Sequence, residues 1–429
     1  MIGLDDIARE LRFLAKSLAT LGILCGALLL STLAVWTGVN EVAEQRADIR
    51  ALLKADAAER ADAIAGQSDY GGAAYYTFHL TYDSPSNLAF AALGSRDVYP
   101  WKHRIRMLAL EGQIYETDAG NPALAGAGRF DYAFVVALLA PLLVVLLLYD
   151  VRAGERAAGR HDLLAATGGD QIWLARTSAR CAALFIAIAT PFMIGAAVSS
   201  TPISSVFIIL ALTALHIVLW SAIAYAIARM PITGPTAATT LAGVWLTVSF
   251  IVPAIGELAI DQSIPSPEGG DIALQQREAV NDAWDLPKEA TMTAFVARHP
   301  QWADAARIEQ PFEWKWYYAF QQVGDQTVED LSRDYRSAIQ RRYDAAGGAA
   351  FASPPIFIMR AFTRLAETDA PAALAYEARV RAFHGRLRAF YYPLLFTDAD
   401  YVPSLFQELP RYEDNDAKLA TTTTHATRN

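Results

Sequence analysis

The side chains with the clearest capacity for chemistry in this 429-residue sequence are its seven histidines and two cysteines, and they are scattered. No H-E-x-x-H run and no cysteine pair at metal-binding spacing is present, since Cys25 and Cys181 lie far apart. A G-x-S-x-G nucleophile motif is also missing. We therefore expect neither catalytic residues nor a metal site. A site assembled in space stays open for four of the histidines, which lie in the two long polar segments 40–131 and 259–412: His79, His103, His299 and His384.

One histidine and one glutamate lie in or near apolar stretches, where an ionisable side chain is a candidate for function. His216 stands well inside an apolar run, and Glu257 stands near the end of another. Both are candidate intramembrane polar residues. The alternative for His216 is a neutral ring that hydrogen-bonds to a neighbouring helix, and Glu257 is close enough to the end of its run to contact water.

Five long apolar stretches must position these residues, and they decide the fold class. A helix rises about 1.5 Å per residue, so about 20 residues cross the hydrocarbon core of a bilayer, which is about 30 Å thick. A backbone in lipid has to satisfy its own hydrogen bonds, which favours helices. We therefore expect a mainly α, polytopic helical membrane protein with about five to six transmembrane helices. The predicted spans are 17–39, 132–149, 181–200, 205–228 and 236–258.

Basic residues beside the spans predict the orientation of the chain, because cytoplasmic segments are enriched in lysine and arginine. Arg9, Arg12 and Lys16 precede the first span, five arginines lie in the loop 150–180, and Arg229 follows the fourth span. With five spans, all three basic segments lie on one side of the membrane. The expected location is the bacterial inner (cytoplasmic) membrane, with multiple passes and a cytoplasmic N-terminus.

The segments 40–131 and 259–412 then lie on the opposite side, where we expect a large, mostly helical periplasmic domain formed by these two insertions. The first opens with an Ala-rich, charged run that favours a helix, and then a Tyr- and Gly-containing stretch leaves strands, loops and helix open. Neither segment contains cysteine, so packing rather than disulfides must stabilise the domain. The polar, Thr-rich tail 413–429 is expected to be disordered. Candidate helices of the second segment lie at about 272–282, 287–298, 312–344 and 357–390.

Two elements on the cytoplasmic side are suited to receive a partner. Residues 1–16 alternate apolar and charged positions at helical spacing, which predicts an amphipathic interfacial helix or an extension of the first span into water. The loop 150–180 is basic, and a break at Gly168–Gly169 separates two helix-compatible halves. Such a loop is either a docking surface for a cytoplasmic partner or a solvated segment whose basic residues serve only to orient the protein in the membrane.

The end of the second span and the loop after it carry a resemblance to a known family. An aromatic–Asp pair, a Glu-Arg pair, a glycine and a leucine pair follow one another, at Tyr149, Asp150, Glu155, Arg156, Gly159, Leu163 and Leu164. With the basic N-terminal helix and the large segment before the second span, this order resembles the permease subunits of ABC-2-type transporters. The sequence departs from that pattern at Arg160–Asp162, where a Thr-Leu-Arg-like run is more usual. Arg176 or Arg180 replaces a lysine often found before the third span.

The C-terminal half resembles one branch of these permeases, which carries a large outer domain of the DUF3526 type. The matching pieces are RHPQW (298–302), WKWYYAFQQVGD (314–325), SPP (353–355), ETD (367–369) and FHGRLRAFYYPLLF (383–396). Their order and spacing extend the resemblance over nearly the whole chain.

The resemblance implies a permease subunit of an ATP-driven exporter. Two ABC ATPase subunits, which bind the ATP and magnesium, would dock on the N-terminal helix and the loop 150–180. The chain itself has no G-x-x-x-x-G-K-[ST] run, so it is expected to bind no cofactor and to be no enzyme. The ATPase-coupling residues in this interpretation are Arg9, Arg12, Glu155, Arg156, Gly159, Leu163 and Leu164.

Further partners follow from the same interpretation. They are a second copy of the chain or a paralogous permease, the lipid membrane and a candidate periplasmic protein, but no nucleic acid. ATP hydrolysis would drive substrate export or transmit force across the membrane. The alternative function is a membrane-anchored sensor or assembly scaffold with a periplasmic domain and no ATPase partner.

Overall fold

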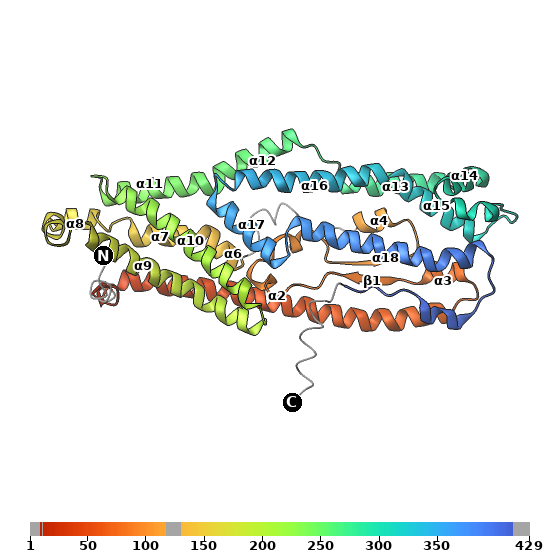
Figure 1. Ribbon diagram of the computed structural model, residues 1–429, viewed down its shortest axis with the longest axis horizontal. Coiled ribbons are helices and arrows are strands. Elements are labelled where there is room, and N and C mark those ends of the chain that lie inside the picture. The colour runs from red at the N-terminus through yellow and green to blue at the C-terminus, as the bar shows by residue number, and fades with distance from the viewer. Residues whose placement is uncertain (1–8, 11, 117–129, 415–429) are drawn as a thin grey trace, which may run out of the picture.

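The computed structural model describes residues 9–10, 12–116 and 130–414. Most of the predicted interfacial helix 1–16 and of the predicted disordered tail 413–429 lies outside these residues. The described chain forms an elongated, mainly helical molecule with apolar helices in one half and polar helices in the other (Figure 1).

Within the described residues, five helices are long and apolar enough to cross a membrane, as predicted. We call them the bundle. Each is a single helix or a run of helical pieces, with bounds Leu18–Ala65, Tyr132–Ala157, Gly169–Val198, Ile203–Ala228 and Gly234–Ser263. Their elements are α2 (Leu18–Ala65), α6 (Tyr132–Phe134), α7 (Ala140–Leu148), α8 (Ala153–Ala157), α9 (His161–Val198), α10 (Ile203–Ala228), α11 (Gly234–Leu246) and α12 (Val252–Ser263).

Helix α2 joins the two halves of the molecule. It begins after Ser17, whose hydroxyl accepts the N–H of Thr20 and so caps the first turn. The first apolar stretch and the Ala-rich charged run after it form one uninterrupted helix of 48 residues. At about 1.5 Å per residue this helix is roughly 70 Å long, and it runs along most of the molecule (Figure 1).

Two π-helical turns, at Val135–Leu139 and Thr247–Ile251, each stand just before a proline. Pro141 and Pro253 have no N–H to donate to the carbonyl four residues earlier. In the first case that carbonyl belongs to Ala137, and the Nε2 of His216 lies 3.3 Å from it. The neighbouring carbonyl of Leu138 accepts the indole N–H of Trp245 at 3.1 Å. Side chains from α10 and α11 thus serve backbone groups of the second apolar helix.

The bundle core contains short segments from the polar half. A ring stack runs from Phe90 through Phe192 and Tyr132 to Phe362, with centroid separations of 5.9, 4.7 and 6.1 Å. Phe90 belongs to the 3₁₀ turn η1 (Ala89–Ala91), and Phe362 belongs to α17 (Pro354–Ala366). At 13 residues α17 is too short to span a bilayer, and it packs its apolar face against the bundle instead.

A second core holds the other half of the molecule together. We call this half the distal domain, and it comprises residues 66–116 and 269–414 without η1 and α17. Its strands β1 (His79–Tyr82) and β2 (Lys102–Ile105) pair antiparallel, with His79 opposite Ile105. Helices pack on this hairpin, and Ile49 of α2 enters the same core. The helices are α3 (Tyr70–Tyr76), α4 (Leu110–Tyr115), α13 (Gly269–Asp282), α14 (Lys288–Arg298), α15 (Trp314–Thr327), α16 (Glu329–Ala349) and α18 (Ala370–Phe396), with 3₁₀ turns at Gly94–Asp97, Pro300–Ala305 and Pro403–Glu408.

Two of the helices predicted in the second polar segment are each divided into two helices in the structure, so the prediction of single helices is wrong. The run 312–344 is divided between α15 and α16 at Val328, whose side chain is fully buried. The run 357–390 is divided between α17 and α18. Glu367 ends α17 in the left-handed region at φ 56°, and the Asp369 side chain caps α18 by accepting the N–H of Ala372. A cap residue followed by Pro371 is a sequence signal for this helix start.

Gly38 of α2 lies directly against the backbone of the η1 segment. A Cβ at this position would collide with the backbone carbonyl of Phe90. We expect Gly38→Ala to destabilise the protein by about 1–3 kcal/mol, because backbone has to move, even though alanine favours a helix by about 1 kcal/mol. Thermal unfolding in detergent measures the effect. Gly22→Ala is the matched control on the same helix, since nothing lies within 4 Å of its Cβ. Equal melting temperatures for the two variants would contradict this packing.

Candidate functional site

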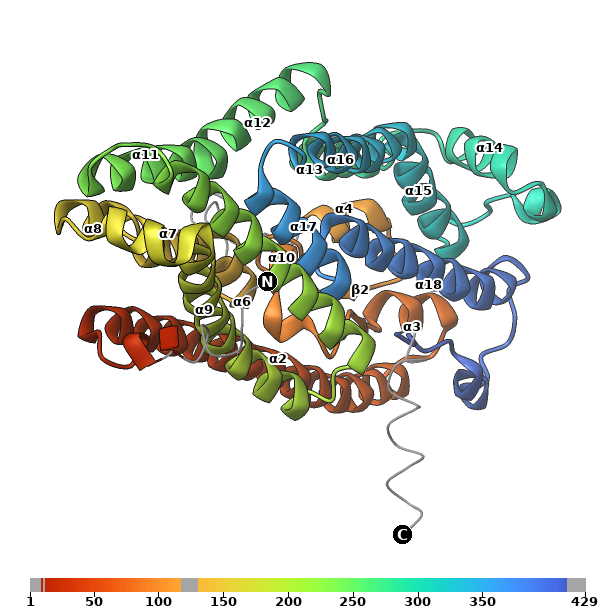
Figure 2. The ribbon, with the colours of Figure 1, turned by 60° about the vertical axis from the view of Figure 1, so that its left-hand side comes forward.

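The loop 150–180 and the described N-terminal residues meet at one end of the bundle, which we call the charged end: Glu10, Arg152, Glu155, Arg156, Asp170 and Arg176. Helix α8 and the start of α2 lie at this end in both views (Figures 1 and 2). The turn between α10 and α11 lies here as well, since Arg156 contacts it. Segments far apart in the sequence therefore converge where the apolar helices stop.

Arg176 joins the N-terminal residues to the loop. Its Nε lies 3.1 Å from Oε2 of Glu10, and its Nη1 donates to Oε1 of Glu155 at 2.9 Å. The other carboxylate oxygen of Glu155 accepts from Arg160 at 2.8 Å. Glu10 is buried, with 3% of its surface exposed. A buried carboxylate without a cation is strongly unfavourable, and Arg9 also lies 3.6 Å from Glu10, at its other carboxylate oxygen. Arg176 is the guanidinium that links Glu10 to Glu155 of the loop.

Two further arginines connect the loop to α10. Arg152 donates to Asp170 at 2.8 Å and to the hydroxyl of Tyr225 at 2.9 Å, and its guanidinium lies over the ring of Trp173. Arg156 donates to the carbonyl of Ile232 at 3.1 Å and approaches that of Ala228. Ala228 is the last residue of α10, where helix carbonyls have no partner in their own helix, and Ile232 lies in the turn that follows. Both arginines position the loop on the bundle.

The predicted coupling residues fall into two groups. Glu155 and Arg156 are tied into the charged end, whereas Leu163 points away from it, with 68% of its surface exposed. Leu164 is partly buried against the bundle core, and Gly159 makes the turn into α9 at φ 68°. Arg9 and Arg12 are exposed. The exposed members are the ones available to a partner protein.

The predicted break at Gly168–Gly169 is present. Gly169 has φ 57° and ψ −153° inside α9, a conformation that only glycine adopts readily. Sequence reasoning did not single out Glu10, Asp170 or Tyr225, because their partners lie elsewhere in the sequence. The one available signal was the concentration of charge at the ends of the apolar runs.

The two candidate intramembrane residues lie apart from these ion pairs. His216 is 3% exposed and is hydrogen-bonded to the carbonyl of Ala137, with its ring against that of Trp220. This geometry matches a neutral ring that replaces the N–H missing at Pro141. Glu257 is exposed on α12. The structure therefore does not bring the two residues together in one site.

Metal ligands do not converge among the described residues, where no group of three or more His, Cys, Asp or Glu side chains can hold an ion. Of the four histidines in the two polar segments 40–131 and 259–412, three are buried in the distal domain. Burial lowers the pKa of His79 and His384 to about 3 and that of His103 to about 4. These rings are neutral at physiological pH and belong to the core.

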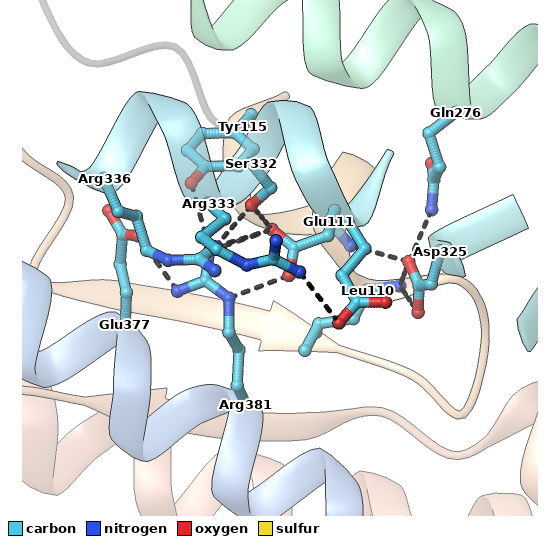
Figure 3. A network of polar contacts seen from close by, with 11 residues as sticks. Leu110, Glu111, Tyr115, Gln276, Asp325, Ser332, Arg333, Arg336, Glu377 and Arg381 are labelled. Atoms are coloured by element: carbon cyan, nitrogen blue, oxygen red, sulfur yellow. Dashed lines mark hydrogen bonds and ion pairs between the residues drawn. The ribbon is translucent and has the colours of Figure 1, made fainter. Parts of the chain in front are cut away.

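A second polar network lies inside the distal domain (Figure 3). Glu111 of α4 accepts both Nε and Nη2 of Arg381 at 2.8 Å, and it accepts the hydroxyl of Ser332 at 2.6 Å. Arg381 also pairs with Glu377 at 3.1 Å and donates to Tyr115 at 3.0 Å. Its members neutralise one another and join α4, α16 and α18. We assign this network a structural role.

Asp325 lies at one side of this network and caps α4, whose preceding residue is an alanine that cannot do so. Its carboxylate accepts the N–H groups of Leu110 at 2.7 Å and Glu111 at 3.0 Å, together with the amide of Gln276 at 3.0 Å. Burial raises the pKa of Asp325 to about 6, although these hydrogen bonds act in the opposite direction.

The distal domain is where a comparison with known proteins finds a match. A family model described as a domain of unknown function, DUF3526, matches residues 272–414. The match covers about a third of the chain and confirms the resemblance of these residues to that domain. No curated protein and no solved structure matches the chain.

The raised pKa of Asp325 predicts a pH dependence of stability. An unfolded aspartate has a pKa of about 3.9, so the folded state binds the proton more tightly than the unfolded state does. The stabilising contribution of this proton is complete below about pH 4 and is lost as the pH rises through about 6. We expect Asp325→Asn to flatten the melting temperature between pH 4 and 6. Asp330→Asn, at an exposed position on α16, is the control. Parallel curves for wild type and Asp325→Asn would disprove the assignment.

Proposed function

We propose that this chain, which contains a DUF3526 domain behind five apolar helices, is the membrane-spanning permease subunit of an ATP-driven ABC-2-type exporter. Two partner ATPase subunits would bind and hydrolyse ATP with magnesium. The permease would couple that hydrolysis to export of a substrate or to force transmission across the bacterial inner membrane. Its N-terminus would be cytoplasmic and its distal domain periplasmic.

One observation carries this proposal. The N-terminal residues and the loop 150–180 are the two elements that the family resemblance assigns to the ATPases, and Arg176 holds them together through Glu10 and Glu155. Loop residues are in turn bonded to α10 through Arg152 and Arg156. A partner that moves the exposed part of the loop would therefore move the N-terminal segment and the membrane helices with it.

The remaining helices suit the partners of such a subunit. Only 6% of the apolar stretch of the helix Gly234–Ser263 is buried. Most of its surface is therefore left for lipid or for a second permease. Helix α2 passes from the charged end into the distal domain without a break. A rigid element of this kind would transmit movement to a periplasmic partner as readily as it would help to enclose a substrate path.

The docking part of the proposal is tested at Leu163, which is exposed beyond the charged end. We expect Leu163→Glu to lower the amount of ATPase recovered with the tagged chain at least fivefold, because a charge would be buried at the contact. The measurement is a mild-detergent pull-down from the native host with mass spectrometry. Leu286→Glu is the matched control, since Leu286 is an exposed leucine of the distal domain.

The melting temperature of both variants should equal that of the wild type, because neither leucine is buried. An undiminished ATPase yield with Leu163→Glu would count against the docking assignment. A wild-type preparation without any ATPase, even after crosslinking, would favour the sensor or scaffold instead.

The orientation is tested with single cysteines in a variant that lacks Cys25 and Cys181. Asp162 and Asp330 have fully or largely exposed side chains and lie in the loop and in α16. In intact cells with a permeabilised outer membrane, an impermeant thiol reagent should label Asp330→Cys. It should label Asp162→Cys only after lysis. The reverse pattern would invert the proposed topology.

A further inference from the structure

A cleft of about 890 Å³ opens where the bundle meets the distal domain, and the proposed function makes no use of it. Its lining comes from the middle of α2, the segment 83–88, the first turn of α10, α16, and the joint between α17 and α18. This volume lies in the range of small-molecule sites, about 300–1,000 Å³. The lining carries charges of both signs, which sets it apart from the bundle core.

The cleft lies at an apolar boundary. Pro202 and Ser205 line it at the very start of α10. Directly after them α10 exposes large apolar side chains: Ile203 at 72%, Phe207 at 68% and Ile208 at 45%. Helix α10 is one of the helices apolar enough to span a membrane, so its first turn marks the edge of the hydrocarbon layer. The cleft therefore opens at the level of lipid headgroups.

Two guanidinium groups in the lining have no carboxylate partner among the described residues. Arg46 donates through Nη2 to the carbonyl of Pro85 at 3.0 Å and to the side-chain oxygen of Asn87 at 2.7 Å, both of which are neutral. The side chain of Arg364 makes no hydrogen bond or ion pair with the described residues. A phosphate group satisfies such arginines well, since its oxygens accept two parallel N–H bonds from one guanidinium.

The carboxylates of the lining are unequally engaged. Asp83 and Asp414 are paired with Arg379 at 2.5 and 3.4 Å, and Asp369 accepts the hydroxyl of Tyr343 while it caps α18. Asp344 is exposed, and among the described residues the one donor to its carboxylate is the amide of Gln340 at 3.1 Å. The lining thus offers a carboxylate for a cation as well as two guanidiniums for an anion.

We propose that the cleft binds the headgroup of a zwitterionic phospholipid that carries a primary ammonium group. The phosphate lies between Arg46 and Arg364, the ammonium contacts Asp344, and the acyl chains lie over Ile203 and Phe207. A purely anionic headgroup fits less well, because five carboxylates and three arginines line the cleft. This inference needs only that the apolar helices span a membrane, and it applies to a transporter and to a scaffold alike.

Native mass spectrometry of the full-length protein in detergent tests the proposal. The probes are phosphatidylethanolamine, phosphatidylglycerol and the soluble headgroup glycerophosphoethanolamine. We expect one tightly bound phosphatidylethanolamine per chain. The double variant R46Q/R364Q should lower its occupancy at least tenfold, and D344N should bring the two lipids to near parity. R341Q, at an exposed position on α16 outside the lining, is the matched control and should bind as the wild type does.

Equal binding of phosphatidylethanolamine by the wild type and R46Q/R364Q would overturn the proposal. The absence of saturable binding to the wild type would also overturn it. So would an affinity for glycerophosphoethanolamine equal to that for the lipid, because such a result would indicate a site for a soluble phosphate compound. Arg46 also hydrogen-bonds to the segment 85–87, so the double variant could lose lipid because that segment is displaced. R364Q alone then decides the question, because the Arg364 side chain makes no hydrogen bond or ion pair with the described residues, and its expected loss of occupancy is at least threefold.

Discussion

The continuity of α2 is the constraint on which the arrangement of the molecule depends. One helix of 48 residues contributes Ala27, Val35 and Val42 to the bundle core and Ile49 to the core of the distal domain. Each helical hydrogen bond of this segment supports the next, so the two halves cannot rotate against each other at α2 without breaking the helix. The distal domain is therefore held in a defined direction relative to the bundle. The η1 segment and α17 reinforce this arrangement, because they belong to the polar half in sequence and to the bundle core in space.

Backbone groups left without a helical partner explain several contacts of the bundle. Pro141 leaves the carbonyl of Ala137 without a donor, and the ring of His216 lies against it. Arg156 approaches the carbonyl of Ala228, which ends α10, and donates to that of Ile232 in the turn after it. In an apolar environment an unpaired carbonyl is costly, so polar side chains are placed where helices are interrupted or end. This explains why the few polar residues of the bundle are found beside prolines and helix termini.

The two charged networks differ in how completely they are closed. In the distal domain Glu111, Arg381, Glu377 and Ser332 bond to one another and join α4, α16 and α18. At the charged end the inner pairs are similarly engaged, but the surface beyond them exposes Leu163 and the start of α9. The network in the distal domain stabilises one packing of helices. The network at the charged end lies beneath an exposed segment, so it can transmit a displacement of that segment to the helices. The cleft at the opposite end of the bundle differs from both, since two of its arginines have no carboxylate partner within the described part of the chain.

The sequence by itself determined the elements, because apolar length and charge at the ends of a run are local properties. It predicted five apolar helices, a break at Gly168–Gly169 and a resemblance of the C-terminal half to DUF3526, whose family model matches residues 272–414. It did not predict the division of 312–344 at Val328 or the passage of α17 into the bundle core. The partners of Arg176, the role of His216 and the cleft around Arg46 were decided only by the tertiary structure. Each of them depends on residues distant in sequence, and a hydrogen bond or a cavity exists only once packing has brought its members within a few ångströms.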